Sequence, residues 1–118
     1  MGFKDWLDKQ PDAIYEANYY LYKDRIEKKR GESSGVHPLE NVTAVIDTGE
    51  ALSSRITLTR LVGTGVIGLF WKKKRGGTTF LLIEGPDFAW VEEVDRKKQK
   101  PAQVFAAKVR EAARRPVT

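Results

Sequence analysis

The pattern of apolar and polar positions predicts strands along most of the chain. Residues 55–59 alternate strictly between polar and apolar, and residues 42–47 are rich in β-branched side chains, as is typical of strands that bury one face. The segments 67–72 and 78–83 flank a Gly-Gly pair, which supplies the positive φ angles of a tight hairpin turn. After a Gly-Pro-Asp turn, residues 88–94 are expected to form a further strand.

An earlier hairpin is predicted near the start of the chain. Residues 17–22 are rich in aromatics, and the extended pattern resumes over 25–30 after a polar pair, so the two segments are expected to be paired strands. The Gly- and Ser-rich segment 31–35 is expected to be a loop.

Helical periodicity occurs at the two ends of the chain. Phe3, Trp6 and Leu7 share the spacing of one apolar stripe before Pro11, which predicts a short amphipathic helix. From Pro101 the apolar positions repeat with a helical period, and a proline is tolerated in the first turn of a helix. One helix is therefore expected to close the fold.

About seven antiparallel strands followed by one C-terminal helix predict a mostly β domain, in which the helix caps a partly open barrel. The segments that carry a family resemblance are YKDR (22–25), PLENV (38–42), RITLTR (55–60), WKKK (71–74) and VFAAK (104–108). With them the chain resembles small uncharacterised PH-like (pleckstrin-homology-like) domain proteins of actinobacteria and their phages. The predicted organisation is a lead-in over 1–16, a PH-like domain over 17–113 and a tail over 114–118. The resemblance implies that the domain binds lipids, peptides or other proteins.

The composition argues against catalysis and against a cofactor. The chain has no cysteine, and its one histidine, His37, is expected on the surface beside a loop, so neither a metal cluster nor a nucleophile–histidine pair is predicted. Gly63 to Gly68 match G-x-G-x-x-G, but a dinucleotide site needs that motif to open a helix, and a hairpin follows here. Glu84 and Glu92 are the one carboxylate pair that could converge across neighbouring strands. We expect a non-enzymatic cytoplasmic protein without a small-molecule substrate, a secretory signal or a transmembrane segment.

Positive charge is the strongest functional signal in the sequence. The net charge is +5, and residues 1–24 carry three Lys against five acidic residues, so the excess lies in the rest of the chain. A third basic cluster lies at 96–100, and the candidate anion-binding residues come from the first two clusters: Lys28, Lys29, Arg30, Lys72, Lys73, Lys74 and Arg75. Such clusters are suited to anionic lipid, which would make the protein membrane-peripheral, or to nucleic acid. Lysines also protect strand edges from aggregation, and that alternative stays open.

A protein partner is predicted from the strands at 67–71, 80–83 and 88–91, which are apolar on both faces. An antiparallel sheet needs only one buried face. Alternation places Leu81 and Ile83 with Ala89 and Val91 on one side and the remaining apolar residues on the other. The candidate cover for the outer side is the N-terminal stripe of Phe3, Trp6 and Leu7 within the chain, a second copy of the chain or a foreign protein. Phe70, which alternation groups with Leu81 and Ile83, is a further candidate interface residue. Binding to another protein or to a second copy is therefore the leading hypothesis, ahead of anionic lipid or nucleic acid.

Overall fold

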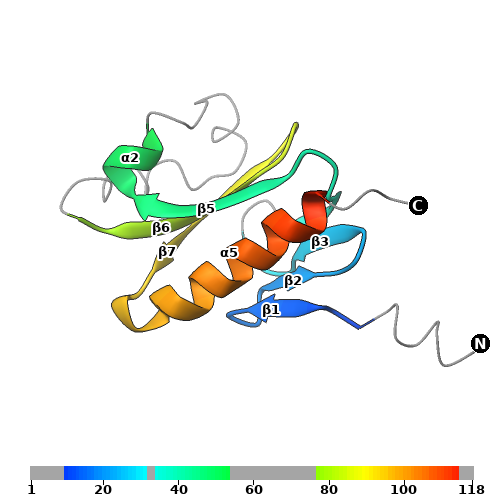
Figure 1. The fold of residues 1–118 in the computed structure, drawn as a ribbon, viewed down its shortest axis with the longest axis horizontal. Helices are drawn as coiled ribbons and strands as arrows, with labels where there is room; N and C mark the ends of the chain where they lie inside the picture. Colours follow the sequence, from blue (N-terminus) through cyan, green and yellow to red (C-terminus); the bar gives the residue numbers. More distant parts are fainter. Residues whose placement is uncertain (1–9, 32–33, 54–76, 115–118) are drawn as a thin grey trace, which may run out of the picture.

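The computed structural model describes residues 10–31, 34–53 and 77–114. These residues form two antiparallel sheets and a C-terminal helix (Figure 1). The first sheet contains, in order, β1 (Ala13–Tyr15), β2 (Tyr19–Leu21), β3 (Arg25–Lys28) and β4 (Gly35–Pro38). The second sheet contains β5 (Thr43–Thr48), β6 (Thr79–Glu84) and β7 (Ala89–Val94). The helical elements are α2 (Gly49–Ser53), the 3-10 turn η1 (Arg96–Lys98) and α5 (Gln99–Arg114).

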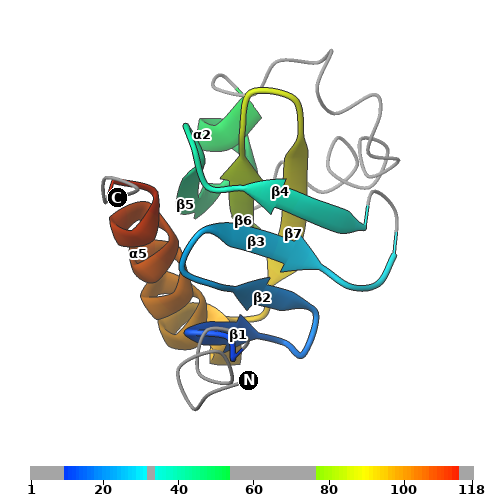
Figure 2. The ribbon, with the colours of Figure 1, turned by 90° about the vertical axis from the view of Figure 1, so that its right-hand side faces the viewer.

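The two sheets lie across one another, and α5 covers one side of the space between them. In Figure 2 strands β3 and β4 of the first sheet cross in front of β6 and β7. Helix α5 contacts β5 in one sheet and β1 in the other, and Arg110 Nη1 donates a hydrogen bond to the backbone oxygen of Ala44 in β5 at 2.7 Å. The chain is thus mostly β with a C-terminal helix, but among the described residues the two sheets remain separate and no closed barrel forms.

The turn between β1 and β2 explains how two such short strands pair. Glu16 and Ala17 both have positive φ angles, of 56° and 50°, and Asn18 N donates to Tyr15 O at 3.1 Å. Two successive central residues with positive φ match the type I′ turn, whose twist suits a hairpin. Neither residue is glycine, so the local sequence does not signal this turn.

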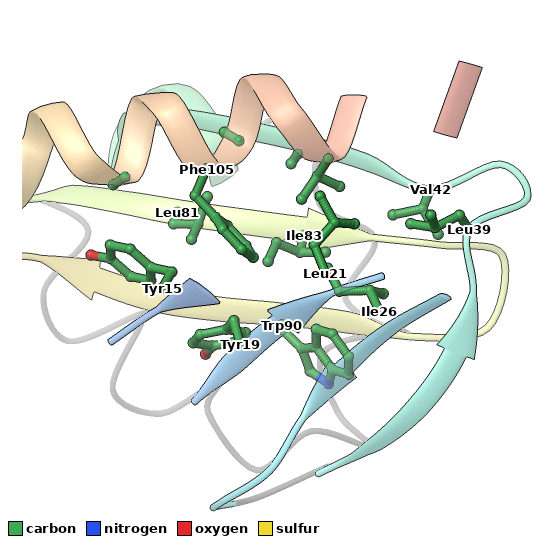
Figure 3. Close-up of a cluster of buried hydrophobic side chains, with 14 of the residues drawn as sticks. Tyr15, Tyr19, Leu21, Ile26, Leu39, Val42, Leu81, Ile83, Trp90 and Phe105 are labelled. Atoms are coloured by element: carbon green, nitrogen blue, oxygen red, sulfur yellow. The ribbon is translucent and has the colours of Figure 1, made fainter. Parts of the chain in front are cut away.

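The main core lies between the two sheets and the helix. Its buried members include Tyr15, Tyr19, Leu21, Ile26, Ala44, Leu81, Ile83, Trp90, Val94, Ala102, Phe105, Ala106 and Val109. Figure 3 shows Phe105 projecting from α5 toward side chains of both sheets. A polar link also joins the sheets, because Tyr19 Oη donates a hydrogen bond to Glu92 Oε1 at 2.7 Å.

The second sheet is buried on its other face too. That face carries Phe80, Leu82, Ala89 and Val91, packed with Leu52 of α2, and each is between 0% and 8% exposed. The prediction that these strands are apolar on both faces is confirmed. The side-chain grouping was wrong, because Leu82 pairs with Val91 and Ile83 with Trp90. Since a single chain already buries this face, it needs no partner to cover it.

Most of the predicted elements within the described residues are confirmed. The hairpin at 17–30, the strands at 42–47, 78–83 and 88–94 and the C-terminal helix are present, and α5 begins two residues before Pro101. Strands β1 and β4 were not predicted, and β1 falls inside the segment assigned to a lead-in. The predicted N-terminal helix, the strands at 55–59 and 67–72 and the glycine motif at 63–68 lie outside the described residues. No helix among the described residues is long and apolar enough to span a bilayer.

Candidate functional site

A groove of about 340 Å³ lies between β1 and α5. Both figures of the whole fold show these elements side by side, and they are in contact. The groove is lined by Ala13 and Ile14 of β1 and by Lys100, Pro101, Val104, Phe105 and Lys108 of α5. It is the place where the edge of the first sheet meets the helix.

The helical period of α5 separates the residues that hold the helix from those that face the groove. Phe105 is buried beneath the groove, with its ring centroid 5.8 Å from that of Tyr15. Lys100, Val104 and Lys108 are four residues apart, so they form one stripe along the helix. Val104 is 48% exposed and Ile14, across the groove, is 52% exposed. The walls are therefore apolar at the centre of the stripe and cationic at both ends.

The backbone of β1 offers a free edge beside this groove. Among the described residues β1 has a neighbouring strand on one side only, which is β2. Tyr15 O accepts the turn hydrogen bond from Asn18 N on the β2 side. Because backbone groups of successive residues in a strand point to opposite sides, the N–H and C=O of Ile14 point away from β2. No hydrogen bond to another described residue uses them.

The charge of the groove has one sign. No acidic side chain is among the described residues that line it, and neither Lys100 nor Lys108 forms an ion pair with a described residue. Two cations in the same partly apolar surface favour an anionic group on whatever binds there.

The structure separates the three basic residues predicted on β3 and its end. Lys28 is only 5% exposed, because strand alternation turns it inward, and its Nζ lies 5.9 Å from the centre of the Tyr19 ring. Lys29 is exposed, with Nζ 4.5 Å above Tyr20. Arg30 Nη2 donates to the backbone oxygens of Glu16 and Ala17, each at 3.4 Å. Lys28 therefore does not share the exposed surface of Lys29 and Arg30.

The other predicted site residues lie outside the described part of the chain. They are Lys72, Lys73, Lys74 and Arg75 of the proposed basic hairpin and Phe3, Trp6, Leu7 and Phe70 of the proposed interface. The basic cluster at 96–98 is described. It forms η1, whose three side chains are exposed, and Lys98 Nζ lies 3.5 Å from Glu16 Oε1.

The tyrosines of the first hairpin do not offer a stacking surface for bases. Tyr15, Tyr19 and Tyr22 are buried, and Tyr20 is half-buried beneath Lys29. Burial raises the pKa of Tyr15 to about 12, with a smaller contribution from Glu16. Burial, followed by the Glu92 carboxylate, raises the pKa of Tyr19 further above its ordinary value of 10.0. These phenols are structural groups held in their neutral form.

The acidic residues and the histidine do not converge on a common substrate position. Glu92 pairs with Leu81 and Glu84 pairs with Ala89, and strand alternation puts the two carboxylates on opposite faces, so the suggested convergence is wrong. His37 is not a simple surface residue, because its ring stacks on Phe88 with centroids 4.0 Å apart and its side chain is 25% exposed. Its Nδ1 lies 3.9 Å from Asp87 Oδ1.

The groove itself was not identified from the sequence. Its signal was the Lys100, Val104 and Lys108 stripe beside the predicted apolar stripe of the C-terminal helix, but recognising it as a site requires knowing that β1 lies against it. Comparison with family models, with curated proteins and with solved structures finds no match for the chain.

Proposed function

We propose that this chain is a non-enzymatic binding or adaptor module that recognises segments of other proteins in the groove between β1 and α5. One observation carries the proposal: two of the three large apolar side chains exposed in the described part, Ile14 and Val104, line the same groove. A single exposed apolar residue is ordinary, whereas apolar residues gathered in one concave place give a partner surface to bury, at about 25 cal/mol per Å².

A PH-like architecture is part of this proposal. Its support is the order of elements, a four-stranded antiparallel sheet, a three-stranded antiparallel sheet and then one C-terminal helix that contacts both. The resemblance to PH-like proteins implies binding of lipids, peptides or proteins, which is consistent with a groove of this kind.

The surroundings of the described titratable groups favour binding over catalysis. Glu92 accepts a hydrogen bond that joins the two sheets. The hollow beside His37 is lined by prolines, carboxylates, Asn41 and Phe88, with no hydroxyl, thiol or amine among its described residues that the imidazole could activate. The surroundings of Glu92 and His37 therefore support structural roles for both residues.

Anionic lipid or nucleic acid is the second candidate. The observation that favours it is the run of exposed cations in η1, Arg96 to Lys98. Binding of this kind is expected to weaken steeply with salt and to survive the loss of apolar groups in the groove. Anionic vesicles and single-stranded DNA at low salt test it directly.

Selection from a library of random peptides displayed on phage tests the protein-binding proposal. The full chain is compared with Val104→Asp, which puts a charge into the groove, and with Ala107→Asp, which makes the same kind of change at an exposed position of α5 outside it. We expect the full chain and Ala107→Asp to retain peptides that Val104→Asp loses. If no peptide is selected, or if every selected peptide binds Val104→Asp equally well, the groove is not a protein-binding site.

A further inference from the structure

A polar cleft of about 330 Å³ lies where the β1–β2 turn of the first sheet meets the end of β7 in the second sheet. It shares none of its described lining residues with the groove. Glu92, whose strand position keeps it away from Glu84, lines this cleft. Four carboxylates line the cleft in all, from the turn, from β7 and from the residue before η1: Glu16, Glu92, Glu93 and Asp95.

The cleft has an excess of negative charge in a chain whose net charge is +5. Its described lining has four carboxylates and two cations, Arg30 and Lys98, which leaves a net charge of −2. Lys98 Nζ already lies 3.5 Å from Glu16 Oε1, and Arg30 Nη2 donates to backbone oxygens of the turn. Neither Glu92 nor Asp95 forms an ion pair with a described residue. The charge of the cleft therefore favours a cationic ligand.

The hydroxyl of Tyr15 is an independent sign of a ligand. Tyr15 is only 3% exposed, and its side chain lines the cleft. In Figure 3 its oxygen points away from Phe105 and the rest of the core cluster. The hydroxyl forms no hydrogen bond with any residue that the structure describes, whereas a buried phenol ordinarily has a partner. Burial, with a smaller contribution from three carboxylates of the cleft, raises the pKa of Tyr15 to about 12, so the phenol is neutral beside these charges.

The spacing of these groups suits an organic cation. In the described part of the chain, no group of three or more His, Asp or Glu side chains is placed to hold a metal ion. A guanidinium group presents five N–H donors in one plane, so it can bond a carboxylate and the Tyr15 oxygen together. It is also less strongly hydrated than an ammonium group, which favours its entry into a partly buried place.

We propose that this cleft is a second binding site, which takes a guanidinium group between the Tyr15 hydroxyl and the carboxylate of Asp95. The Tyr15 oxygen accepts one N–H of the ligand, and the Asp95 carboxylate accepts another. The guanidinium belongs to an arginine side chain of a protein partner or to free arginine. Because the cleft and the groove have separate linings, this site does not depend on the proposed function of the groove.

Titration of the isotope-labelled full chain with capped single amino acids at low salt, followed by backbone amide NMR, tests the proposal. We expect N-acetyl-arginine N-methylamide to cause saturable shift changes at Tyr15, Asn18 and Glu93, and the corresponding capped lysine to bind at least about fivefold more weakly. Free arginine distinguishes the two sources. Tighter binding of the capped form indicates a protein side chain, and tighter binding of free arginine indicates the amino acid itself.

Two conservative variants test the residues of the site. Tyr15→Phe removes the hydroxyl and keeps the ring, and should weaken binding of the capped arginine by about tenfold. Tyr20→Phe, whose hydroxyl is outside the described lining of the cleft, should leave it unchanged. Asp95→Asn removes the charge but keeps a side chain that can accept the capping bond from Lys97 N, and should weaken binding by about threefold. Asp87→Asn, at an exposed carboxylate elsewhere, is its control.

The amide spectrum of each variant shows whether it is folded, and Asp95→Asn decides alone if Tyr15→Phe is not. No saturable shift changes at the cleft, equal binding of the capped arginine and the capped lysine, or unchanged affinity in Asp95→Asn or in a folded Tyr15→Phe would overturn the proposal.

Discussion

The second sheet buries both of its faces, whereas the first sheet buries one face, and its edge strand β1 has a neighbour on one side only among the described residues. In β6 four successive residues, Phe80 to Ile83, are buried. In β3 burial alternates, so that Ile26 and Lys28 face inward while Arg25 and Glu27 are partly exposed. The described exposed apolar residues outside α5, Ile14 and Val36, are both on edge strands of the first sheet. The apolar residues on both faces of the second sheet therefore stabilise the fold. The apolar surface available to a partner lies on the first sheet and on helix α5 beside it.

The largest expected effect on stability comes from a charge placed in the second sheet, compared with the same charge placed in the first sheet. Leu82→Asp puts a carboxylate on the buried second face, which costs several kcal/mol and should remove the cooperative unfolding transition in urea. Val36→Asp, on an exposed position of β4, should change the unfolding free energy by less than about 0.5 kcal/mol. A folded Leu82→Asp protein with normal circular dichroism would show that the second face is accessible after all.

A smaller effect is expected where α5 joins the two sheets. Phe105→Ala removes a ring buried against Tyr15 and should lower the unfolding free energy by about 3 to 5 kcal/mol. Val104→Ala, at the adjacent exposed position, should change it by less than about 0.5 kcal/mol. Urea denaturation followed by far-ultraviolet circular dichroism measures both. Equal losses for the two variants would mean that the groove residue is part of the core.

The hydrogen bond between Tyr19 and Glu92, which joins the sheets, should contribute less to the unfolding free energy than the Phe105 ring does. Tyr19→Phe removes the hydrogen bond to Glu92 and should cost about 1 to 2 kcal/mol near neutral pH, because Glu92 is only partly buried and regains water. Tyr20→Phe, whose hydroxyl is not the one bonded to Glu92, is the matched control. An equal loss in both variants would mean that the inter-sheet bond does not stabilise the fold.

The same two phenols predict how stability changes with pH. Their folded pKa values are raised above 10.0, to about 12 for Tyr15 and further for Tyr19, so the unfolded chain loses these protons first as pH rises. Their contribution is complete below about pH 10 and decreases between about pH 10 and 12. The urea midpoint of Tyr19→Phe should therefore fall less over this window than that of Tyr20→Phe. Parallel decreases would contradict a buried, neutral Tyr19.

Long apolar segments were predictable from the sequence, and short polar edge strands were not. Strands β5, β6 and β7 are runs of apolar and β-branched residues with strong turn residues at their ends, and helix α5 has a clear helical period. β4 contains Gly35 and Pro38, and its sequence GVHP does not alternate cleanly between apolar and polar residues. Glycine and proline are tolerated in an edge strand. β1 depends on a turn at Glu16 and Ala17 that has no glycine. The register of β6 with β7 was also inaccessible, because both faces are apolar and a slip of one residue leaves the pattern unchanged.

The candidate site was less predictable than the fold because it depends on contacts between distant segments. Strand alternation places Lys28 on the inward face with Ile26. The prediction of one basic cluster over Lys28, Lys29 and Arg30 did not take this alternation into account. The groove brings Ile14 together with Val104, ninety positions later in the chain. Nothing in the local sequence of either residue indicates the other.

Backbone amide NMR of the isotope-labelled full chain, titrated with a peptide from the display selection, tests the central claim most directly. The account predicts that the largest shift changes fall on β1 and on the Lys100 to Lys108 stretch of α5, and that the amides of Phe80, Leu82 and Val91 change little. Saturable changes centred on β6 and β7, with β1 and α5 unaffected, would show that the second sheet rather than the groove is the surface that meets a partner.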